Sequence, residues 1–358
     1  MKRRAALVLT LILIIVSLCG CTPKATPEKG DFVVTDSVGR EVSIPENPQS
    51  VCTLCPFSGP IIVMLGSGDK ITSFTNNAAR SRLLMQICPS LENAVVVKNS
   101  GSVNAEEIMA RNTDLIILNS GVYEDSTERA KIDAMGIPYI VIDYNTVEDQ
   151  LEAVEILGKT FGNTEKAEEY ISYFRSVIDR AQKGAQGTPK RLYHSVNEAV
   201  RTDYEGSYCA EWTALTGVEN VSVESGKLSI EGEKAYTTLE QIYAWNPDII
   251  ICNEAQVDDY ILSDSKWQGL SCVQNGEVYQ IPIGITRWGH PSSFETPLAI
   301  LWLMNLLYPD TFEVDMNTEI KTFYKNFFGF EINDEWLGAI IEGTEMREPK
   351  TEHKEDAA

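Results

Sequence analysis

The alternation of hydrophobic and polar positions is most regular between residues 147 and 182. Apolar side chains recur there at steps of three and four residues, and charged residues occupy the intervening positions, which is the pattern of an amphipathic helix. Gly162 and Asn163 interrupt the pattern, and it resumes beyond them. The segment predicts one long helix, or two in line, with a length of about 50 Å at about 1.5 Å per residue. Such a length exceeds the diameter of a small domain and indicates a connection between two lobes.

The segments on either side of this helix repeat one another. Residues 104–119 read NAEEIMARNTDLIILN and residues 238–253 read TLEQIYAWNPDIIICN, with identity at 8 of 16 aligned positions. Each copy opens with a helix-capping residue, Asn104 or Thr238, followed three positions later by Glu or Gln. Each copy ends in an all-apolar run, which is typical of a strand buried on both faces of a parallel sheet. We therefore expect an α/β protein of two Rossmann-like lobes with parallel sheets, joined by the long α-helix.

These patterns divide the chain into successive parts. They are a lipoprotein signal peptide (1–20), a polar tether (21–30), an N-terminal α/β lobe (31–146), the linking helix (147–182), a C-terminal α/β lobe (183–342) and an acidic disordered tail (343–358). Ligands of α/β lobes meet the loops at the carboxyl ends of the strands. The cleft between the two lobes is therefore the expected ligand site.

The net charge and the N-terminal segment bear on where the protein acts. The formal charge of −22 becomes −25 without the first twenty residues and their three basic side chains, which argues against a nucleic-acid partner. The segment itself has a basic start, an apolar core too short for a comfortable membrane span, and the ending Leu18-Cys19-Gly20-Cys21. It resembles a bacterial lipoprotein signal, whose cleavage would leave Cys21 as a lipid-modified N-terminus. The alternative is an ordinary secretory signal that is cut nearby.

The sequence leaves the pairing and the role of the cysteines open. The cysteines after Cys21 are Cys52, Cys55, Cys88, Cys209, Cys252 and Cys272. Six cysteines allow 15 full pairings, and the sequence does not choose among them. Cys52-Thr-Leu-Cys55 invites a thiol redox function, yet Cys52 falls near the end of a predicted strand (50–54), where residues three apart face opposite ways. Core or loop thiols are therefore favoured, and redox chemistry at Cys52 and Cys55 is the remote alternative.

Taken together, these features resemble a known family. A lipoprotein signal, a tether, the repeated block in each lobe and a late Arg-Trp-Gly-His-Pro-Ser-Ser loop (287–293) are similar to the class III solute-binding proteins of ABC importers, which serve ferric siderophores, haem and cobalamin. The resemblance covers about residues 31–341. It implies lobes that close modestly over a ligand, because the linking helix is stiff.

The resemblance also implies a function. It indicates a monomer that is lipid-anchored to the outside of the cell membrane and captures an iron- or cobalt-containing chelate, namely a ferric siderophore, haem or a corrinoid. The protein would deliver this chelate to an ABC permease dimer, with no covalent chemistry and no cofactor of its own.

Two other classes of function fit the sequence less well. An enzyme is disfavoured, because the sequence has no GxSxG, HExxH, P-loop or GxGxxG motif and only His194, His290 and His353 as histidines. A binder of bare or small-chelator metal ions such as nickel, zinc or manganese normally needs several His and carboxylate ligands from both lobes. The first lobe contains no histidine, so this binder remains the alternative to the metal chelate.

Candidate ligand contacts lie in the loops at strand ends. They are Phe57, Asn76, Asn99, Ser100, Tyr123, Arg201, Tyr208, Asn253, Arg287, Trp288 and His290. Arg287 is expected to supply countercharge for an anionic chelate, or else a surface salt bridge in this acid-rich chain. Trp288 is expected to offer a flat apolar face, and His290 to ligate a metal or only to form a hydrogen bond. Tyr208 can equally belong to the core.

The repeated block also predicts a partner surface. Glu106 and Glu240 occupy equivalent positions in the first turns of their two helices. A carboxylate there stabilises the helix through its dipole by about 0.3–1 kcal/mol, which would explain either glutamate alone. The family resemblance implies instead that each glutamate docks onto arginines of one permease subunit, so that the paired lobes match the two-fold symmetry of the permease dimer.

Overall fold

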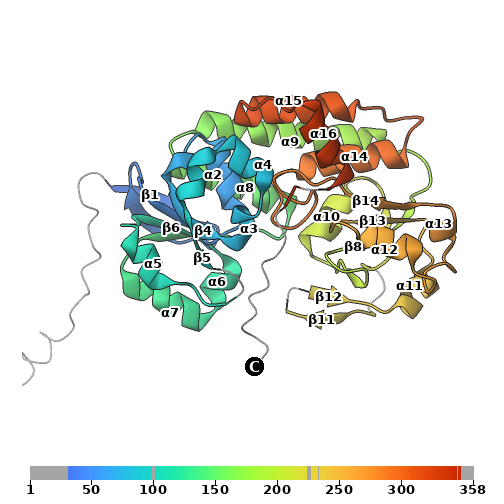
Figure 1. The fold of residues 1–358 in the computed structure, drawn as a ribbon, viewed down its shortest axis with the longest axis horizontal. Helices are drawn as coiled ribbons and strands as arrows, with labels where there is room; N and C mark the ends of the chain where they lie inside the picture. Colours follow the sequence, from blue (N-terminus) through green and yellow to red (C-terminus); the bar gives the residue numbers. More distant parts are fainter. Residues whose placement is uncertain (1–30, 99–100, 224–226, 233, 345, 348–358) are drawn as a thin grey trace, which may run out of the picture.

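The computed structural model describes residues 31–98, 101–223, 227–232, 234–344 and 346–347. Two α/β lobes lie side by side, and the long helix α9 runs along one side of both (Figure 1). The predicted signal peptide, Cys21 and the tether lie outside the described residues. Within the described residues, no helix combines the length and the apolar character needed to span a membrane.

The N-terminal lobe is built on a five-stranded parallel sheet with the order β5-β4-β3-β6-β7. Its strands, preceded by the antiparallel hairpin β1-β2, are β1 (Asp31–Thr35), β2 (Glu41–Pro45), β3 (Val51–Thr53), β4 (Ile71–Thr75), β5 (Val95–Lys98), β6 (Leu115–Asn119) and β7 (Tyr139–Ile142). Its helices, with two short 3-10 turns, are α2 (Ser58–Met64), η1 (Gly68–Lys70), α3 (Asn76–Ala79), α4 (Arg82–Ile87), η2 (Pro89–Asn93), α5 (Ala105–Ala110), α6 (Ser120–Glu124) and α7 (Ser126–Met135).

The C-terminal lobe has a four-stranded parallel sheet with the order β10-β8-β13-β14 and a small antiparallel sheet with the order β11-β12-β9. Its strands are β8 (Arg191–Ser195), β9 (Arg201–Thr202), β10 (Glu219–Asn220), β11 (Ser229–Glu231), β12 (Lys234–Tyr236), β13 (Ile249–Cys252) and β14 (Val278–Gln280). Its helices are α10 (Tyr208–Ala214), α11 (Leu239–Trp245), α12 (Val257–Ser263), α13 (Ser271–Gln274), α14 (Thr296–Leu307), α15 (Met316–Phe328) and α16 (Asp334–Glu342). The predicted fold class, two α/β lobes with parallel sheets, is confirmed.

The duplicated block folds in the same way in both lobes. The capping residues Asn104 and Thr238 each accept a hydrogen bond from the backbone three residues on, which starts α5 and α11. Both helices end before an asparagine in the left-handed region, with φ of 51° at Asn112 and 47° at Asn246. Two residues further on, Asp114 accepts the backbone N–H groups of Gln49 and Ser50, which lead into β3, and Asp248 accepts the backbone N–H of Arg191 in β8. The identities in the repeat therefore lie where the chain turns from a helix into a buried strand.

The linking segment differs from its prediction. It forms two helices, α8 (Val147–Thr160) and α9 (Thr164–Gly184), separated by Gly162 with φ of 70°. These helices fold back on one another, because Arg175 of α9 pairs with Glu148 near the start of α8 and a Cβ at Gly158 would meet Ala167. A left-handed glycine commonly ends a helix, so the connection of about 30 Å is made by α9 alone rather than by all of residues 147–182.

One hydrophobic core extends through both lobes. Its buried residues run from Val34 in β1 to Met346 and include Ile117 of β6 and Ile251 of β13. Helix α15 packs on α9 through Tyr170, whose ring lies 5.5 Å from that of Phe327. A smaller cluster covers the outer face of each sheet. Because close-packed interiors deform little, this shared core restricts the relative motion of the lobes.

The described part of the C-terminal tail is folded, in contrast to the predicted disorder of residues 343–358. Met346 is 1% exposed, and its carbonyl oxygen accepts the backbone N–H of Arg82 in the N-terminal lobe at 3.1 Å. The adjacent Arg347 forms a β-bridge with Ser81. The apolar side chain of Met346 is buried although it lies within an acidic tail. Residues 346–347 therefore cross from the C-terminal lobe to the N-terminal lobe. Residues 348–358 lie outside the described part.

Candidate ligand-binding cleft

A cavity lies between the two lobes and is lined by three separate parts of the chain. The N-terminal lobe contributes α2, α3 and α4, the C-terminal lobe contributes the loop after β14, and the tail contributes one residue. The lining residues are Pro56, Pro60, Asn77, Ala78, Ser81, Leu84, Ile285, Thr286, Arg287, His290, Ser292 and Arg347. The cavity volume is about 30 Å³, which holds one or two water molecules. The lobes are in contact at its edge, where Ser81 Oγ donates to the carbonyl oxygen of Ile285 at 2.8 Å.

A buried carboxylate holds the loop of the C-terminal lobe in place. Glu295 is fully buried and accepts the backbone N–H groups of Ile285 at 3.0 Å and Thr286 at 2.6 Å. The hydroxyl groups of Thr286 and Tyr324 also donate to it. Burial raises the pKa of Glu295, although these hydrogen bonds oppose the shift. The carboxylate thus fixes the chain just before Arg287 enters the cleft.

Two glycines allow the close approaches that the loop requires. A Cβ at Gly284 would lie 2.1 Å from both Glu295 Oε1 and the Tyr324 hydroxyl. Gly289 has φ of 70°, and a Cβ there would lie 2.5 Å from the ring of Trp212. Only glycine fits both positions without displacing its neighbours. The backbone of the loop is therefore specified by packing on both sides of Arg287.

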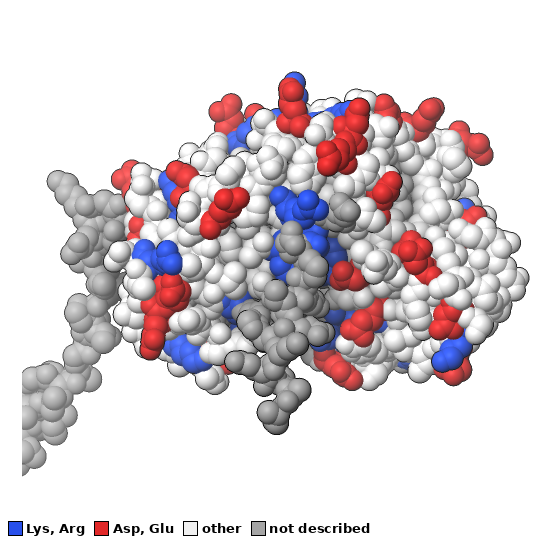
Figure 2. All heavy atoms as spheres, viewed as in Figure 1, with Lys and Arg blue, Asp and Glu red and all other residues white. Residues whose placement is uncertain are grey.

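Cationic side chains gather where the lobes meet. Arg287, Arg347 and His290 line the cavity, and Arg287 also interacts electrostatically with Arg201 of β9 and with Arg80 of the N-terminal lobe. We call Arg80, Arg201, Arg287 and Arg347 the arginine cluster. Figure 2 shows basic side chains collected near the centre of the face viewed, at the boundary between the lobes, in a protein that is acidic overall. Such a concentration of positive charge favours an anion.

The guanidinium of Arg287 is bonded to two neighbouring side chains. Its Nη1 donates to Asn197 Oδ1 and forms an ion pair with Glu254 Oε2, and its side chain is 15% exposed. Burial lowers the pKa of Arg287, and Glu254 raises it in opposition. Burial and the neighbouring Arg287 and Arg80 also lower the pKa of Arg347 to about 10. Because arginine is not deprotonated in proteins at neutral pH, both guanidinium groups carry a positive charge.

His290 contributes a hydrogen-bond donor rather than a charge. Its Nδ1 accepts the backbone N–H of Ser292 at 3.2 Å, so in the neutral ring the proton resides on Nε2. Burial, together with Arg287 and Arg347, lowers the pKa of His290 well below its usual range. The ring is therefore neutral at physiological pH and offers Nε2–H to a ligand. In this tautomer Nε2 has no lone pair for a metal.

Three predicted ligand contacts lie in the core instead of the cleft. Trp288 is 0% exposed and packs into the main core. Phe57 is also fully buried, with its ring 5.0 Å from that of Tyr144. The hydroxyl of Tyr208 donates to Gln150 Oε1 at 2.7 Å beneath the cleft. The expectation that Trp288 presents a flat face to the ligand is therefore wrong, because the turn at Gly289 directs its indole inward.

The remaining predicted contacts are spread over several places. Arg201 belongs to the arginine cluster, and Asn76 precedes the cavity residue Asn77. Asn253 is fully buried, and its Oδ1 accepts the backbone N–H of Asn197, which in turn contacts Arg287. Tyr123 packs instead under the guanidinium of Arg40, 5.0 Å from the ring centroid, away from the lining residues. Asn99 and Ser100 lie outside the described residues.

Sequence reasoning missed several residues that line the cavity. Asn77, Ser81, Thr286, Ser292 and Arg347 were not singled out. Asn77 and Ser81 lie in the polar and basic stretch after β4, and that location at a strand end was a usable signal. Met346 and Arg347 place an apolar and a basic side chain next to each other within the acidic tail, and this pair was the signal for Arg347.

The cysteines of the described residues are free thiols, and the two thiols of the CxxC pair are buried. Cys52 and Cys55 are 0% and 2% exposed. Burial raises the pKa of Cys52 to about 12 and that of Cys55 to about 11. Since the thiolate is the reactive form, these residues do not support the thiol redox alternative.

The two predicted docking glutamates are exposed in the first turns of α5 and α11. These helices lie on the outer sides of the two lobes, away from α9 (Figure 1). Hydrogen bonding to the helix N-terminus and to Thr238 lowers the pKa of Glu240. Both side chains are thus available to a partner that bridges the lobes.

Two α/β lobes with one shared core and a cation-lined cleft define a two-lobed binding protein. The family model described as periplasmic binding protein matches residues 52–283. Because this match spans more than half of the chain, the protein belongs to that family. It is a substrate-binding protein of an ABC transporter, of the class III fold, that acts outside the cytoplasm.

Individual relatives agree with this assignment. The chain is 23% identical over 326 residues to the molybdate-binding protein MolA of Haemophilus influenzae, covering 83% of this chain and 91% of that protein. It is 25% identical over 325 residues to the substrate-binding lipoprotein YvrC of Bacillus subtilis, covering 87% and 100%. A periplasmic solute binding protein from Veillonella parvula has a similar structure, with a TM-score of 0.73 and 26% identity over 87% of this chain and 97% of that one. MolA bound to molybdate gives a TM-score of 0.72, with 21% identity over 85% and 99%.

Proposed function

We propose that this protein captures a compact anionic metal species, either a metal oxyanion or a small anionic metal chelate, in the cleft between its lobes and delivers it to an ABC permease. The observation that carries the proposal is that Arg287, Arg347 and the neutral His290 line one small cavity, with Arg80 and Arg201 close enough to Arg287 to act on it electrostatically. Guanidinium groups bind oxyanions and carboxylates with paired, charge-assisted hydrogen bonds.

The size of the cavity narrows the class of ligand. A space of about 30 Å³ is far smaller than haem, a corrinoid or a ferric siderophore. To admit one of those, the lobes would have to separate and residues 346–347 would have to leave the cleft. The core shared by the lobes opposes a large separation. A compact anion needs only a slight opening of the lobes. The small cavity therefore favours a small anionic metal chelate over the larger chelates expected from the sequence.

The charge of the cleft argues against a bare cation as cargo. Arg287 and Arg347 line the site and Arg80 and Arg201 act on Arg287 electrostatically, whereas Glu254 is engaged by Arg287 and Glu295 by the loop backbone. A divalent ion would meet net repulsion there. Among the relatives, MolA is described as binding molybdate, which is an oxyanion, and this supports the same class of ligand here.

A titration panel tests the proposal. Mature protein is titrated with molybdate, tungstate, ferric citrate, haem, cyanocobalamin, and nickel and zinc chloride, with calorimetry as the readout. We expect saturable binding of one equivalent for at least one of the compact anions and none for haem or cyanocobalamin. Tighter binding of haem or cyanocobalamin, or nickel binding that His290→Ala abolishes, would contradict it.

We also propose that the mature chain is anchored to the membrane through Cys21 and acts as a monomer. The support is the Leu18-Cys19-Gly20-Cys21 ending of the N-terminal segment, together with the lipoprotein description of YvrC. Changing Cys21→Ser should move the protein from the membrane fraction to the soluble fraction or the medium of the native host. Retention of the Cys21→Ser protein in the membrane fraction would show that the anchor is elsewhere.

A further inference from the structure

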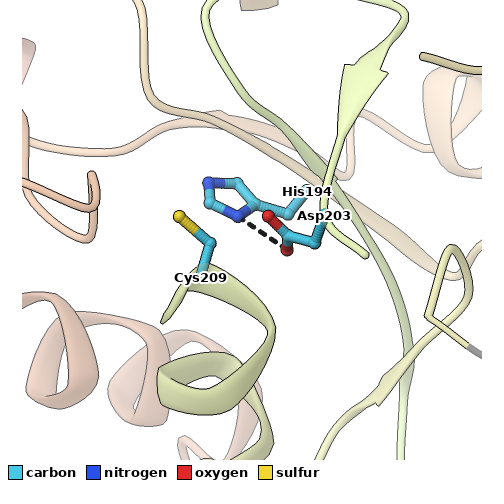
Figure 3. A group of neighbouring side chains, drawn as sticks. All are labelled: His194, Asp203 and Cys209. Atoms are coloured by element: carbon cyan, nitrogen blue, oxygen red, sulfur yellow. Dashed lines mark hydrogen bonds and ion pairs between the residues drawn. The ribbon is translucent and has the colours of Figure 1, made fainter. Parts of the chain in front are cut away.

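Beneath the cleft loop, three side chains of different chemistry point toward one another (Figure 3). His194 comes from β8, Asp203 from the loop after β9, and Cys209 from the first turn of α10. They are 0%, 2% and 2% exposed, and their nitrogen, oxygen and sulfur donor atoms all lie within 4.8 Å of one another. We call these residues the His-Asp-Cys cluster.

The cluster leaves buried polar atoms without partners. Asp203 Oδ2 lies 3.0 Å from His194 Nδ1 and accepts from Asn220 Nδ2 at 2.7 Å. In contrast, Asp203 Oδ1 and His194 Nε2 are both buried and have no hydrogen-bond partner in the described residues. Buried polar side chains are almost always satisfied, so two orphaned atoms on neighbouring residues require an explanation. Both are of the kinds that coordinate metal ions.

We propose that His194, Asp203 and Cys209 form a buried site for a divalent transition metal ion, with zinc as the ion that suits the donors best. Imidazole, carboxylate and thiolate together form a ligand set typical of Zn²⁺. Tetrahedral bonds of about 2.0–2.3 Å place the donor atoms about 3.3–3.8 Å apart. The donor atoms of the cluster lie within 4.8 Å of one another, so the three side chains would have to draw closer together around the ion, with His194 and Asp203 rearranging the hydrogen bond between them.

Binding can be written with atoms balanced. The Cys209 thiol loses its proton to solvent as the sulfur–metal bond forms. Its weak hydrogen bond to the carbonyl oxygen of Gly289, at 3.3 Å, is then lost. That carbonyl remains satisfied, because Trp212 Nε1 also donates to it at 2.8 Å. Three protein ligands leave one position for water or another donor.

The site would support the cleft loop without being the cargo site. Gly289 joins the cluster to His290, which lines the cavity. Trp212 packs its edge against the His194 ring with centroids 5.8 Å apart, so one indole contacts both a metal ligand and the loop carbonyl. The three ligands belong to one lobe and are absent from the cavity lining. The ion is therefore expected to be a structural one, independent of which anion the cleft carries.

Cobalt substitution tests the site on the intact mature protein. Metal-free protein is titrated with cobalt chloride, and the thiolate-to-cobalt charge-transfer absorption in the near ultraviolet is recorded, followed by zinc chloride as competitor. We expect the band to saturate at one equivalent and to disappear when zinc is added. Losing an outer-shell partner typically costs about 10- to 100-fold in metal affinity, so Cys209→Ser should weaken zinc binding by about 100-fold or more and abolish the band.

The matched control is Cys272→Ser, which removes another buried thiol of the same lobe that lies outside the cluster. It should keep the band and the stoichiometry. If Cys209→Ser does not fold, the wild-type stoichiometry and the near-isosteric Asp203→Asn, which should weaken zinc binding, decide the question. Absence of a band in wild type, or a band that persists in Cys209→Ser, would overturn the site. The proposed function is tested separately, by the titration of the cleft with anions.

Discussion

The two lobes are built from the same block, yet they contribute differently to the cleft. On the N-terminal side the cavity is lined by prolines, alanine, leucine and small polar groups such as Asn77 and Ser81. On the C-terminal side it is lined by the loop that carries Arg287 and His290. The duplicated residues themselves lie at helix starts and strand entries in both lobes. The comparison shows that the repeat encodes the scaffold, whereas the chemistry resides in loops that differ between the lobes.

The lobes also differ in how firmly their cleft residues are held. The loop of the C-terminal lobe is fixed by the fully buried Glu295 and its four donors. The N-terminal edge has no such carboxylate among its lining residues, and it meets the rest of the cleft through the hydrogen bond from Ser81 to Ile285 and the β-bridge between Ser81 and Arg347. A firmly held cation loop needs little reorganisation on binding, which favours affinity. We infer that the C-terminal lobe selects the ligand and the N-terminal lobe completes the enclosure.

The largest effect is expected where the two lobes are proposed to act alike. Changing Glu106→Ala and Glu240→Ala together should reduce transport to background, because each glutamate is proposed to dock on one permease subunit. Ligand affinity should stay within about twofold, since neither residue lies near the cleft. Uptake of labelled ligand by cells and calorimetry on the purified protein separate the two quantities. The control is Glu107→Ala with Gln241→Ala in the same helical turns, and transport that survives the first pair would refute docking.

The difference in anchoring predicts a large loss of stability in the C-terminal lobe. Glu295→Ala leaves two backbone N–H groups and the Tyr324 hydroxyl without an acceptor. Losses from a buried hydrogen-bonded charge are about 3–5 kcal/mol in the free energy of unfolding. Urea denaturation of the wild type and the variant measures this loss in the free energy of unfolding. Glu128→Ala, which removes a buried carboxylate of the N-terminal lobe, should cost less. If Glu295→Ala lost no more stability than Glu128→Ala, the proposed difference in anchoring between the lobes would be contradicted.

The buried histidine of the cleft predicts a smaller, pH-dependent effect. Burial and the nearby arginines hold the pKa of His290 well below its usual range in the folded state. Above pH 6.5 the ring is neutral in both folded and unfolded chains, so the titration of His290 takes nothing from the free energy of unfolding. As the pH falls below 6.5 the unfolded chain takes up the proton first, and stability is lost by up to about 2 kcal/mol by pH 5. His290→Gln should show a shallower pH dependence of unfolding, and parallel curves for the two proteins would contradict the prediction.

Much of the fold could be predicted because its signals are local. Helix starts at Asn104 and Thr238 follow from capping chemistry, and the strands after Asp114 and Asp248 follow from their uninterrupted apolar runs. The path of α8 and α9 could not be predicted, since helical periodicity identifies a buried stripe but not the element that covers it. Gly162 was visible in the sequence, but its left-handed backbone became clear only in the structure.

The cleft was less predictable than the fold. Arg287 and His290 were identified because a glycine-rich loop after a strand leaves few other roles for them. Trp288, between them in the chain, is buried instead, because a loop residue can face either way and tertiary packing alone decides. The His-Asp-Cys cluster joins residues that are 9 and 6 positions apart on three elements, and this spacing matches no metal-binding motif. Arg347 was hidden by the acidic composition of the residues around it.

The most direct test of the account compares one residue from each lobe in anion binding. The compact anion that binds tightest in the titration panel is titrated into wild type, Arg287→Ala and Asn77→Ala by calorimetry. A charge-assisted hydrogen bond contributes about 2 kcal/mol, which corresponds to about 30-fold in Kd. We therefore predict a loss of about 30-fold or more for Arg287→Ala and less than about threefold for Asn77→Ala. Wild-type affinity in Arg287→Ala, or a larger loss in Asn77→Ala, would contradict the claim that the C-terminal lobe captures the anion.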